Sequence, residues 1–128
     1  EEARAALARK RAALEDMVFF DYDMSTVRQD QRAKMDAKAN VLREDGAITL
    51  RIVGHADERG STEYNLALGT RRAQSLKDYL MGFGIAADRI QILSMGEERP
   101  LETGQNESAW SRNRRGEFQI LTGLGGDR

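Results

Sequence analysis

The sequence predicts an α+β fold, a sandwich of the order βαβαββ in which two main helices pack on one face of a mixed four-stranded sheet. Short segments with apolar residues in period-two alternation are typical of half-buried strands, and two longer segments with helical spacing lie between them. A helix between two strands requires a crossover connection, so we expect at least part of the sheet to be parallel. The 128 residues suffice for one domain with a core.

The first half of the chain is predicted to contain a helix, a strand, a polar loop and a second helix. Residues 1–16 are rich in Ala, Arg and Glu with a thin apolar stripe, which indicates a solvent-exposed helical linker or N-terminal extension. A membrane-surface helix is the alternative, but bulky apolar residues are lacking. Residues 17–20, MVFF, are strand formers, and the loop 21–26 follows. Apolar residues at i, i+4 and i+7 predict a helix from Gln29 to Glu44, which Asp45-Gly46 ends.

The second half is predicted to contain three strands and one long helix. Residues 48–53, ITLRIV, alternate with period two, and 90–95 and 116–121 are the other two strands. The helix is predicted from Glu63 to Met81. Its packing stripe is expected to consist of Leu66, Gly69, Ala73, Leu76 and Leu80. Between the last two strands we expect a long loop with the only proline.

Composition limits the classes of function. The net charge is -1 with 32% charged residues, which argues against a nucleic-acid binder that works by bulk charge. There is no Cys and only one histidine, so neither a thiolate nor a multi-His metal site is expected, and no cofactor motif is present. No apolar run approaches the ~20 residues of a membrane span. We expect a single domain over 17–122, preceded by the helical extension 1–16 and followed by a loose tail, 123–128.

A charged turn between the strand 48–53 and the long helix is the candidate site. Asp57 lies just past the strand, close to the start of the helix. Tyr64, Leu68 and Arg72 are spaced by four and form one row on the helix, beside its packing stripe. We therefore expect Arg72 to be half-buried, with its guanidinium directed toward the helix start, where a carboxylate is its natural partner.

Two interpretations of these charges remain open. In the first, Asp57 and Arg72 pair with each other, with Arg59 or Glu63 nearby, and the cluster is structural. In the second, the two charges stand apart and hold a zwitterion, with an ammonium group on Asp57 and a carboxylate on Arg72. Backbone N–H groups at the helix start would add to the attraction for the carboxylate.

The segment 54–80, GHADERGSTEYNLALGTRRAQSLKDYL, resembles the core of the OmpA-like peptidoglycan-binding domain family. Its motif of Asn, two residues, Leu, three residues and Arg-Ala is met by Asn65, Leu68, Arg72 and Ala73. Within the family the chain is most similar to the peptidoglycan-associated lipoproteins. Further segments carry the resemblance: VFFDYD at 18–23, MDAKANVL at 35–42, GIAADRI and SMGEERP within 84–100, and NRRGE at 113–117.

The resemblance implies non-covalent binding of the peptidoglycan stem peptide through meso-diaminopimelate. Asp57 and Arg72 occupy the positions that hold the ammonium and the carboxylate of that residue in the family. The loop after the first strand lines the same pocket, which adds Asp23 with its neighbours Ser25 and Thr26. The full set of expected ligand-binding residues is Asp57, Arg72, Asp23, Thr26, Leu68 and Asn65, with His55, Tyr64 and Arg114 in support.

The resemblance also implies partners and a location. The expected partners are peptidoglycan, TolB and, as a further candidate, TolA, in the periplasm of a Gram-negative envelope. An anchor to the outer membrane is expected upstream of Glu1. A porin of the OmpA type or a flagellar stator protein has a similar wall-anchoring domain and is the alternative. No nucleic acid and no cofactor are implied.

The remaining polar residues have structural explanations that we weigh against functional ones. His55, Asp57 and Ser61 are close in sequence, but no nucleophile-elbow motif accompanies them, so we expect no enzyme and a His55 that bonds the loop backbone. Trp110 is expected to cover the core. The basic cluster of Arg112, Arg114 and Arg115 either contacts an anionic glycan, a nucleic acid or a protein, or ties the last strand to the loop around Asp57.

Three positions depart from the pattern of the family. Ala56 stands in place of the usual Thr, Gly69 in place of a frequent Ser, and Gly116 in place of a β-branched residue. We expect the pocket to tolerate the first two because both residues are small. The third weakens the strand propensity of the last strand without affecting the charged site.

Overall fold

A computed structural model of the chain describes residues 1–124, so the part of the predicted loose tail at 125–128 lies outside the described residues. The elements, in chain order, are α1 (Glu2–Glu15), β1 (Val18–Phe19), the 3-10 helix η1 (Gln29–Gln31), α2 (Arg32–Glu44), β2 (Thr49–His55), α3 (Thr62–Met81), the 3-10 helix η2 (Ala87–Arg89), β3 (Ile90–Gly96), α4 (Glu107–Asn113) and β4 (Arg115–Thr122).

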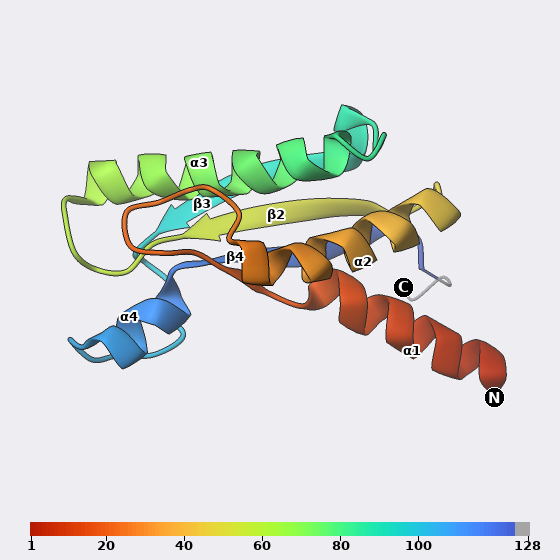
Figure 1. Cartoon of the computed structure of the whole chain (residues 1–128), viewed down its shortest axis with the longest axis horizontal. Coiled ribbons are helices and arrows are strands. Elements are labelled where there is room, and N and C mark those ends of the chain that lie inside the picture. Colours follow the sequence, from red (N-terminus) through yellow and green to blue (C-terminus); the bar gives the residue numbers. More distant parts are fainter. Residues whose placement is uncertain (125–128) are drawn as a thin grey trace.

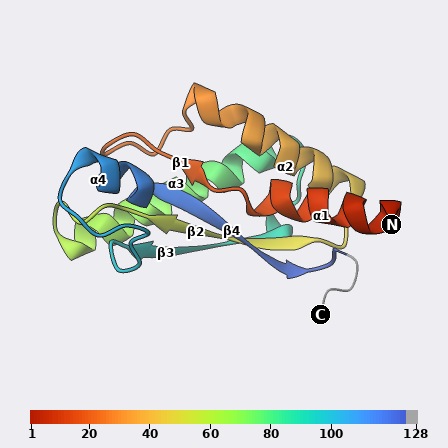
Figure 2. The same ribbon diagram turned by 90° about the horizontal axis from the view of Figure 1, so that it is seen from below.

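The four strands form one mixed sheet in the order β1-β4-β2-β3. The strand β4 is antiparallel to both β1 and β2, and the crossover through α3 makes β2 and β3 parallel. Figure 1 shows α3 running along β2 and β3, and Figure 2 shows α1, α2 and α3 on one side of the sheet. The predicted fold class is therefore confirmed, with α1 added to the helical layer.

The core lies between the helical layer and the sheet. Ile48, Leu50 and Ile52 are fully buried, as their alternation predicted. They meet helix side chains such as Leu76 and Leu80 in one continuous apolar cluster. Burial of this apolar surface is the main force that holds the helices on the sheet.

The helix α3 approaches β2 closely through two glycines. A Cβ atom on Gly54 would lie 1.8 Å from the carbonyl oxygen of Gly69, and one on Gly69 would lie 2.2 Å from Oγ of Ser94. Gly69 therefore serves helix–sheet packing, and its departure from the family pattern is not a change in the pocket. The predicted packing stripe is wrong at one position, because Leu66 is 37% exposed at the sheet edge while Leu68 is buried.

The predicted long loop between the last two strands contains the helix α4, so that prediction is wrong. Asn106 caps the helix by accepting from the backbone N–H of Ala109 at 2.9 Å. At the other end, the side chain of Asn113 accepts from the N–H groups of Leu101 and Glu102 at 2.7 and 3.1 Å. The two asparagines fold residues 101–113 into a compact unit at one end of the sheet.

Both ends of the described chain pack more closely than the sequence predicted. Leu14 in α1 is fully buried, so one side of the last turn of this helix packs against the domain. Leu124, at the start of the predicted loose tail, is buried in the core cluster. None of the helices within residues 1–124 has the length and apolar character needed to cross a membrane.

Candidate ligand-binding site

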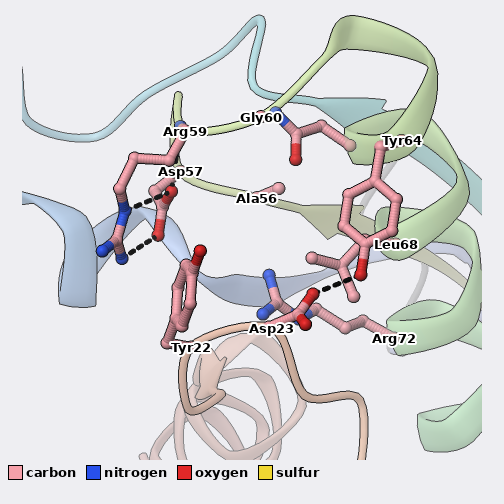
Figure 3. A pocket seen from close by; sticks show the side chains of 10 residues that line it. Tyr22, Asp23, Ala56, Asp57, Arg59, Gly60, Tyr64, Leu68 and Arg72 are labelled. Atoms are coloured by element: carbon pink, nitrogen blue, oxygen red, sulfur yellow. Dashed lines mark hydrogen bonds and ion pairs between the residues drawn. The ribbon is translucent and has the colours of Figure 1, made fainter.

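A small cavity lies where β2 ends and α3 begins, and the loop after β1 forms its third side (Figure 3). The residues that line it are Tyr22, Asp23, Ala56, Asp57, Arg59, Gly60, Tyr64, Asn65, Leu68 and Arg72. Five of the six predicted ligand-binding residues are thus brought together. The sixth, Thr26, does not line the cavity, and neither does its neighbour Ser25. Their hydroxyls are therefore not among the groups that the lining of this cavity offers to a ligand.

Arg72 is fully buried beneath the cavity rather than half-buried. Its Nε donates to the carbonyl of Met24 at 2.8 Å, Nη1 to that of His55 at 2.8 Å, and Nη2 to that of Asp21 at 3.0 Å. Burial lowers the pKa of Arg72 to about 10, so the side chain stays charged at neutral pH. This guanidinium ties the loop after β1 to the end of β2 and retains two of its five N–H bonds for other acceptors.

Asp57 is 5% exposed and pairs with its neighbour in the turn, not with Arg72. The backbone N–H and Nε of Arg59 donate to Oδ1 at 3.1 Å each, and Nη2 donates to Oδ2 at 2.8 Å. Arg114 lies on the other side, with Nη1 3.6 Å from Oδ2. Burial alone raises the pKa of Asp57, but the bonds from Arg59 and the nearby charge of Arg114 lower it overall.

The interpretation of a closed bridge between Asp57 and Arg72 is therefore wrong, because each group has other partners. The same interpretation expected Arg59 near Asp57, and this part of it is confirmed. The guanidinium of Arg59 lies between two aromatic rings, 4.0 Å from the ring centroid of Tyr22 and 3.8 Å from that of Trp110. Trp110 thus covers Arg59 and does not cover the core, and its Nε1 donates to Glu58 at 2.9 Å.

Asp23 lines the cavity opposite Asp57 with an uncommon backbone conformation. Its φ of 57° lies in the left-handed region, which residues other than glycine rarely adopt. Arg72 holds the carbonyls on both sides of it, and the hydroxyl of Tyr64 donates to its carboxylate. Such strain concentrates at functional sites, which is one reason to regard this loop as part of a binding site.

Asn65 supplies an amide that the protein itself leaves unused. The side chain is 1% exposed and lines the cavity. Among the described residues, its Nδ2 has no hydrogen-bond partner. Buried polar groups are nearly always paired, so an unpaired donor at a cavity points to a ligand acceptor.

Of the predicted supporting residues, Tyr64 lines the cavity and Arg114 lies beside it. Arg114 donates to the carbonyl of Phe20 at 2.8 Å and to Glu107 at 2.9 Å, and it also reaches Asp57. Together with Arg115, which is buried, it ties the last strand to its neighbours, so of the basic cluster only Arg112 is exposed. The ion pair with Arg114 lowers the pKa of Glu107.

His55 does not bond the loop backbone through its side chain, contrary to expectation. Its ring is buried, and neither ring nitrogen has a hydrogen-bond partner among residues 1–124, with Nε2 lying 3.6 Å from Glu117. Its backbone carbonyl is what binds Arg72. Ser61 caps α3 by accepting from the N–H of Tyr64 at 3.1 Å, so a catalytic triad with His55 is not assembled.

The role of Tyr22 and Trp110 was missed by the sequence prediction. Both belong to segments read as loops, and no periodic pattern connects positions 22, 59 and 110. A signal for the Asp57–Arg59 pair exists, since an acid and a base two residues apart in a tight turn can meet. Within the described part of the chain, no three His, Cys, Asp or Glu side chains are grouped to hold a metal ion.

Known proteins resemble this chain over most of its length. A profile of the OmpA family matches residues 19–114. The peptidoglycan-associated lipoprotein of Rhizobium meliloti (strain 1021) is 43% identical over 111 residues, which cover 87% of this chain and 61% of the relative. That of Pseudomonas aeruginosa is 39% identical over 101 residues and is covered to 60%. The chain thus spans about three fifths of the length of these relatives.

Solved structures show the same fold. The peptidoglycan-associated lipoprotein of Burkholderia pseudomallei superposes with a TM-score of 0.80 at 33% identity, over 82% of this chain and 89% of that one. The C-terminal domain of Helicobacter pylori MotB reaches a TM-score of 0.74 at 17% identity, over 83% of each chain, a likeness of fold alone. With its sheet, its charged cavity and its profile match in agreement, the chain belongs to the OmpA family.

Proposed function

We propose that the chain binds peptidoglycan non-covalently through the free end of meso-diaminopimelate in the stem peptide. The observation that supports it most is a cavity lined by two carboxylates, Asp23 and Asp57, and two guanidinium groups, Arg59 and Arg72. Charges of both signs fixed on rigid elements suit a small group that carries an ammonium and a carboxylate on one carbon atom. Preplaced charges also keep the ordering cost of binding low.

Each end of the zwitterion has a candidate partner. The ammonium is assigned to Asp57, whose lowered pKa keeps it ionised at neutral pH. The carboxylate is assigned to the two remaining N–H bonds of Arg72 and to the unpaired amide of Asn65. Each charge-assisted bond contributes about 1.5–3 kcal/mol net, which gives moderate affinity for a single peptide. Many peptides on one wall would then retain the protein by avidity.

The names of the relatives support a location in the cell envelope. Proteins at about 40% identity are named peptidoglycan-associated lipoproteins, which favours a non-enzymatic anchor of the outer membrane to the wall, located in the periplasm. Contact with TolB and TolA belongs to the same proposal. A domain of an OmpA-type porin or of a flagellar stator would hold the wall by the same site, and the sequence upstream of residue 1 distinguishes these alternatives.

Co-sedimentation with insoluble peptidoglycan tests the proposal. Asp57→Asn removes the partner of the ammonium, and Arg72→Ala removes a partner of the carboxylate, so both variants are expected to remain in the supernatant. Arg71→Ala is the matched control, because it removes an exposed arginine next to Arg72 in the same helix. Circular dichroism must show folded variants, since Arg72 also holds three backbone carbonyls.

The chemistry of the ligand gives a second arm of the test. Walls whose stem peptides carry lysine lack the carboxylate at the side-chain end and should bind poorly. Equal binding to both kinds of wall, or parent-like sedimentation of both Asp57→Asn and Arg72→Ala, would show that the assignment of the ligand is wrong.

A further inference from the structure

The cavity already contains an ion pair that imitates the proposed ligand. Arg59 makes three hydrogen bonds to the carboxylate of Asp57, from its backbone N–H, Nε and Nη2. With Arg114 also facing Oδ2 at 3.6 Å, little of the carboxylate is left for a new donor. An ammonium group with three N–H donors that binds Asp57 therefore competes with Arg59 for its oxygens.

Arg59 is the more exposed partner of this pair. Its side chain is 30% exposed, whereas that of Asp57 is 5% exposed and is held from two sides. Figure 3 shows the Arg59 side chain extending along Asp57 at the rim of the cavity, with Tyr22 beside them. The rings of Tyr22 and Trp110 keep the guanidinium in place even when its bonds to Asp57 are broken.

Arg72 can offer a carboxylate only its two remaining N–H bonds, and it has little freedom to move. All three of its nitrogens donate to backbone carbonyls, and its side chain is fully buried. It cannot turn toward a ligand without releasing the loop that carries Asp23. The cation in the cavity that is able to change partner is therefore Arg59.

We infer that Arg59 determines specificity by ion-pair exchange. The ammonium of the ligand replaces Arg59 as the partner of Asp57. The carboxylate of the ligand then forms an ion pair with the released guanidinium of Arg59, so no charge is left unpaired. This inference rests on the proposed function, because it concerns the same ligand. A ligand with an ammonium but no carboxylate would break the Asp57–Arg59 pair and leave Arg59 without an anion. The site therefore rejects simple amines.

Titration calorimetry with two tripeptides that differ in one group measures this selectivity. Both carry L-Ala and D-Glu, and the third residue is either meso-diaminopimelate or lysine, which lacks the second carboxylate. The parent is expected to prefer the diaminopimelate peptide by tenfold or more. In Arg59→Met the ratio is expected to fall toward one, because the zwitterion loses a partner while the amine no longer displaces a resident cation.

Two further variants make the comparison specific. Arg112→Met removes the same charge from an exposed position of α4 and should keep the ratio of the parent. Arg59→Lys retains a cation without the planar fork and should restore part of the selectivity. Thermal unfolding of each variant checks that the fold is intact, which is expected because Arg59 lies at the rim of the cavity.

Each outcome separates the inference from the proposed function. If Arg59→Met keeps the ratio of the parent, Arg72 and Asn65 read the carboxylate without it, and the exchange is wrong although diaminopimelate is still bound. If both peptides bind more tightly with an unchanged ratio, Arg59 merely blocks Asp57, and the exchange is again wrong. If the parent binds neither peptide, the proposed function fails and the exchange fails with it.

Discussion

At the scale of single residues, this protein buries charges together with their partners. Glu117 in β4 accepts from Nε of Arg115 at 2.8 Å and lies 3.6 Å from Nε2 of His55. The nearby imidazole of His55 and the guanidinium of Arg115 together lower the pKa of Glu117 to about 2. Arg115 in turn donates to the carbonyl of Arg99, so this cluster joins the start of β4 to the loop after β3.

The pKa of Glu117 predicts a dependence of stability on pH. Its folded-state value lies below the ordinary 4.5, so the stabilisation is present above pH 4.5 and is lost as the pH falls toward 2. We expect Glu117→Gln to lower the free energy of unfolding by about 2 kcal/mol at pH 6, less than the full shift implies because the side chain is 30% exposed. Urea denaturation of both proteins at several pH values measures the difference.

The difference between the parent and Glu117→Gln should shrink as the pH falls, and most of it should be lost at about pH 2, where Glu117 is half protonated in the folded state and almost fully protonated in the unfolded chain. A difference that stays constant from pH 6 to pH 2 would contradict the ion pair as its cause.

At the scale of elements, a buried lysine fixes the direction in which the N-terminal helix leaves the domain. Lys38 in α2 is fully buried and donates to the carbonyls of Ala13, Leu14 and Asp16 at 2.5 to 3.1 Å. These carbonyls lie at the C-terminal end of α1, where helix carbonyls lack partners and the helix dipole attracts a cation. Burial lowers the pKa of Lys38 to about 7.

Removal of this contact should release α1 selectively. Lys38→Met keeps the length of the side chain but leaves three buried carbonyls without donors, at a cost of about 2–3 kcal/mol. We expect amide hydrogen exchange to accelerate throughout α1 while α3 keeps its protection. Lys77→Met, a change of the same charge on the long helix, is the control and should leave α1 protected. Unchanged exchange in Lys38→Met would show that Leu14 alone holds the helix.

At the scale of the whole molecule, the cavity joins segments that are distant in the sequence. The loop 21–24, the turn 56–60 and α3 line it, and α4 adds Trp110 from outside. Arg72 connects α3 to the loop 21–24 and to the end of β2, because it lies in α3 and donates to the carbonyls of Asp21, Met24 and His55. A ligand in this cavity therefore contacts groups that only the folded chain brings together.

Binding should for this reason stabilise the entire fold. A ligand that binds the folded chain alone, at a concentration of 100 times its dissociation constant, adds about 2.7 kcal/mol to the free energy of unfolding. We expect the diaminopimelate tripeptide to raise the melting temperature of the parent in a calorimetric scan. The same peptide should leave the melting temperature of Asp57→Asn unchanged. A parent that shows no shift at saturating peptide would contradict binding at this cavity.

Much of the fold was determined by local sequence. The alternation at 48–53 placed Ile48, Leu50 and Ile52 on the buried face, and the helical spacing located α2 and α3, because apolar periodicity reflects which side of an element faces the core. The helix α4 was not predicted, because a helix of seven residues shows too little apolar periodicity. Its formation depends instead on the asparagine at each end. The close approach of Gly69 in α3 to Gly54 in β2 is likewise invisible in the sequence of α3 alone.

For the site, the sequence by itself determined which residues gather: Asp57, Arg72, Asp23, Leu68 and Asn65 all line one cavity. Only the tertiary structure decided which charge meets which. A fully buried guanidinium must satisfy its N–H bonds with the nearest acceptors, and for Arg72 these are backbone carbonyls of two segments that fold against α3. Asp57 consequently pairs with Arg59. This pairing depends on distances in the folded chain, which the spacing of residues along the sequence does not specify.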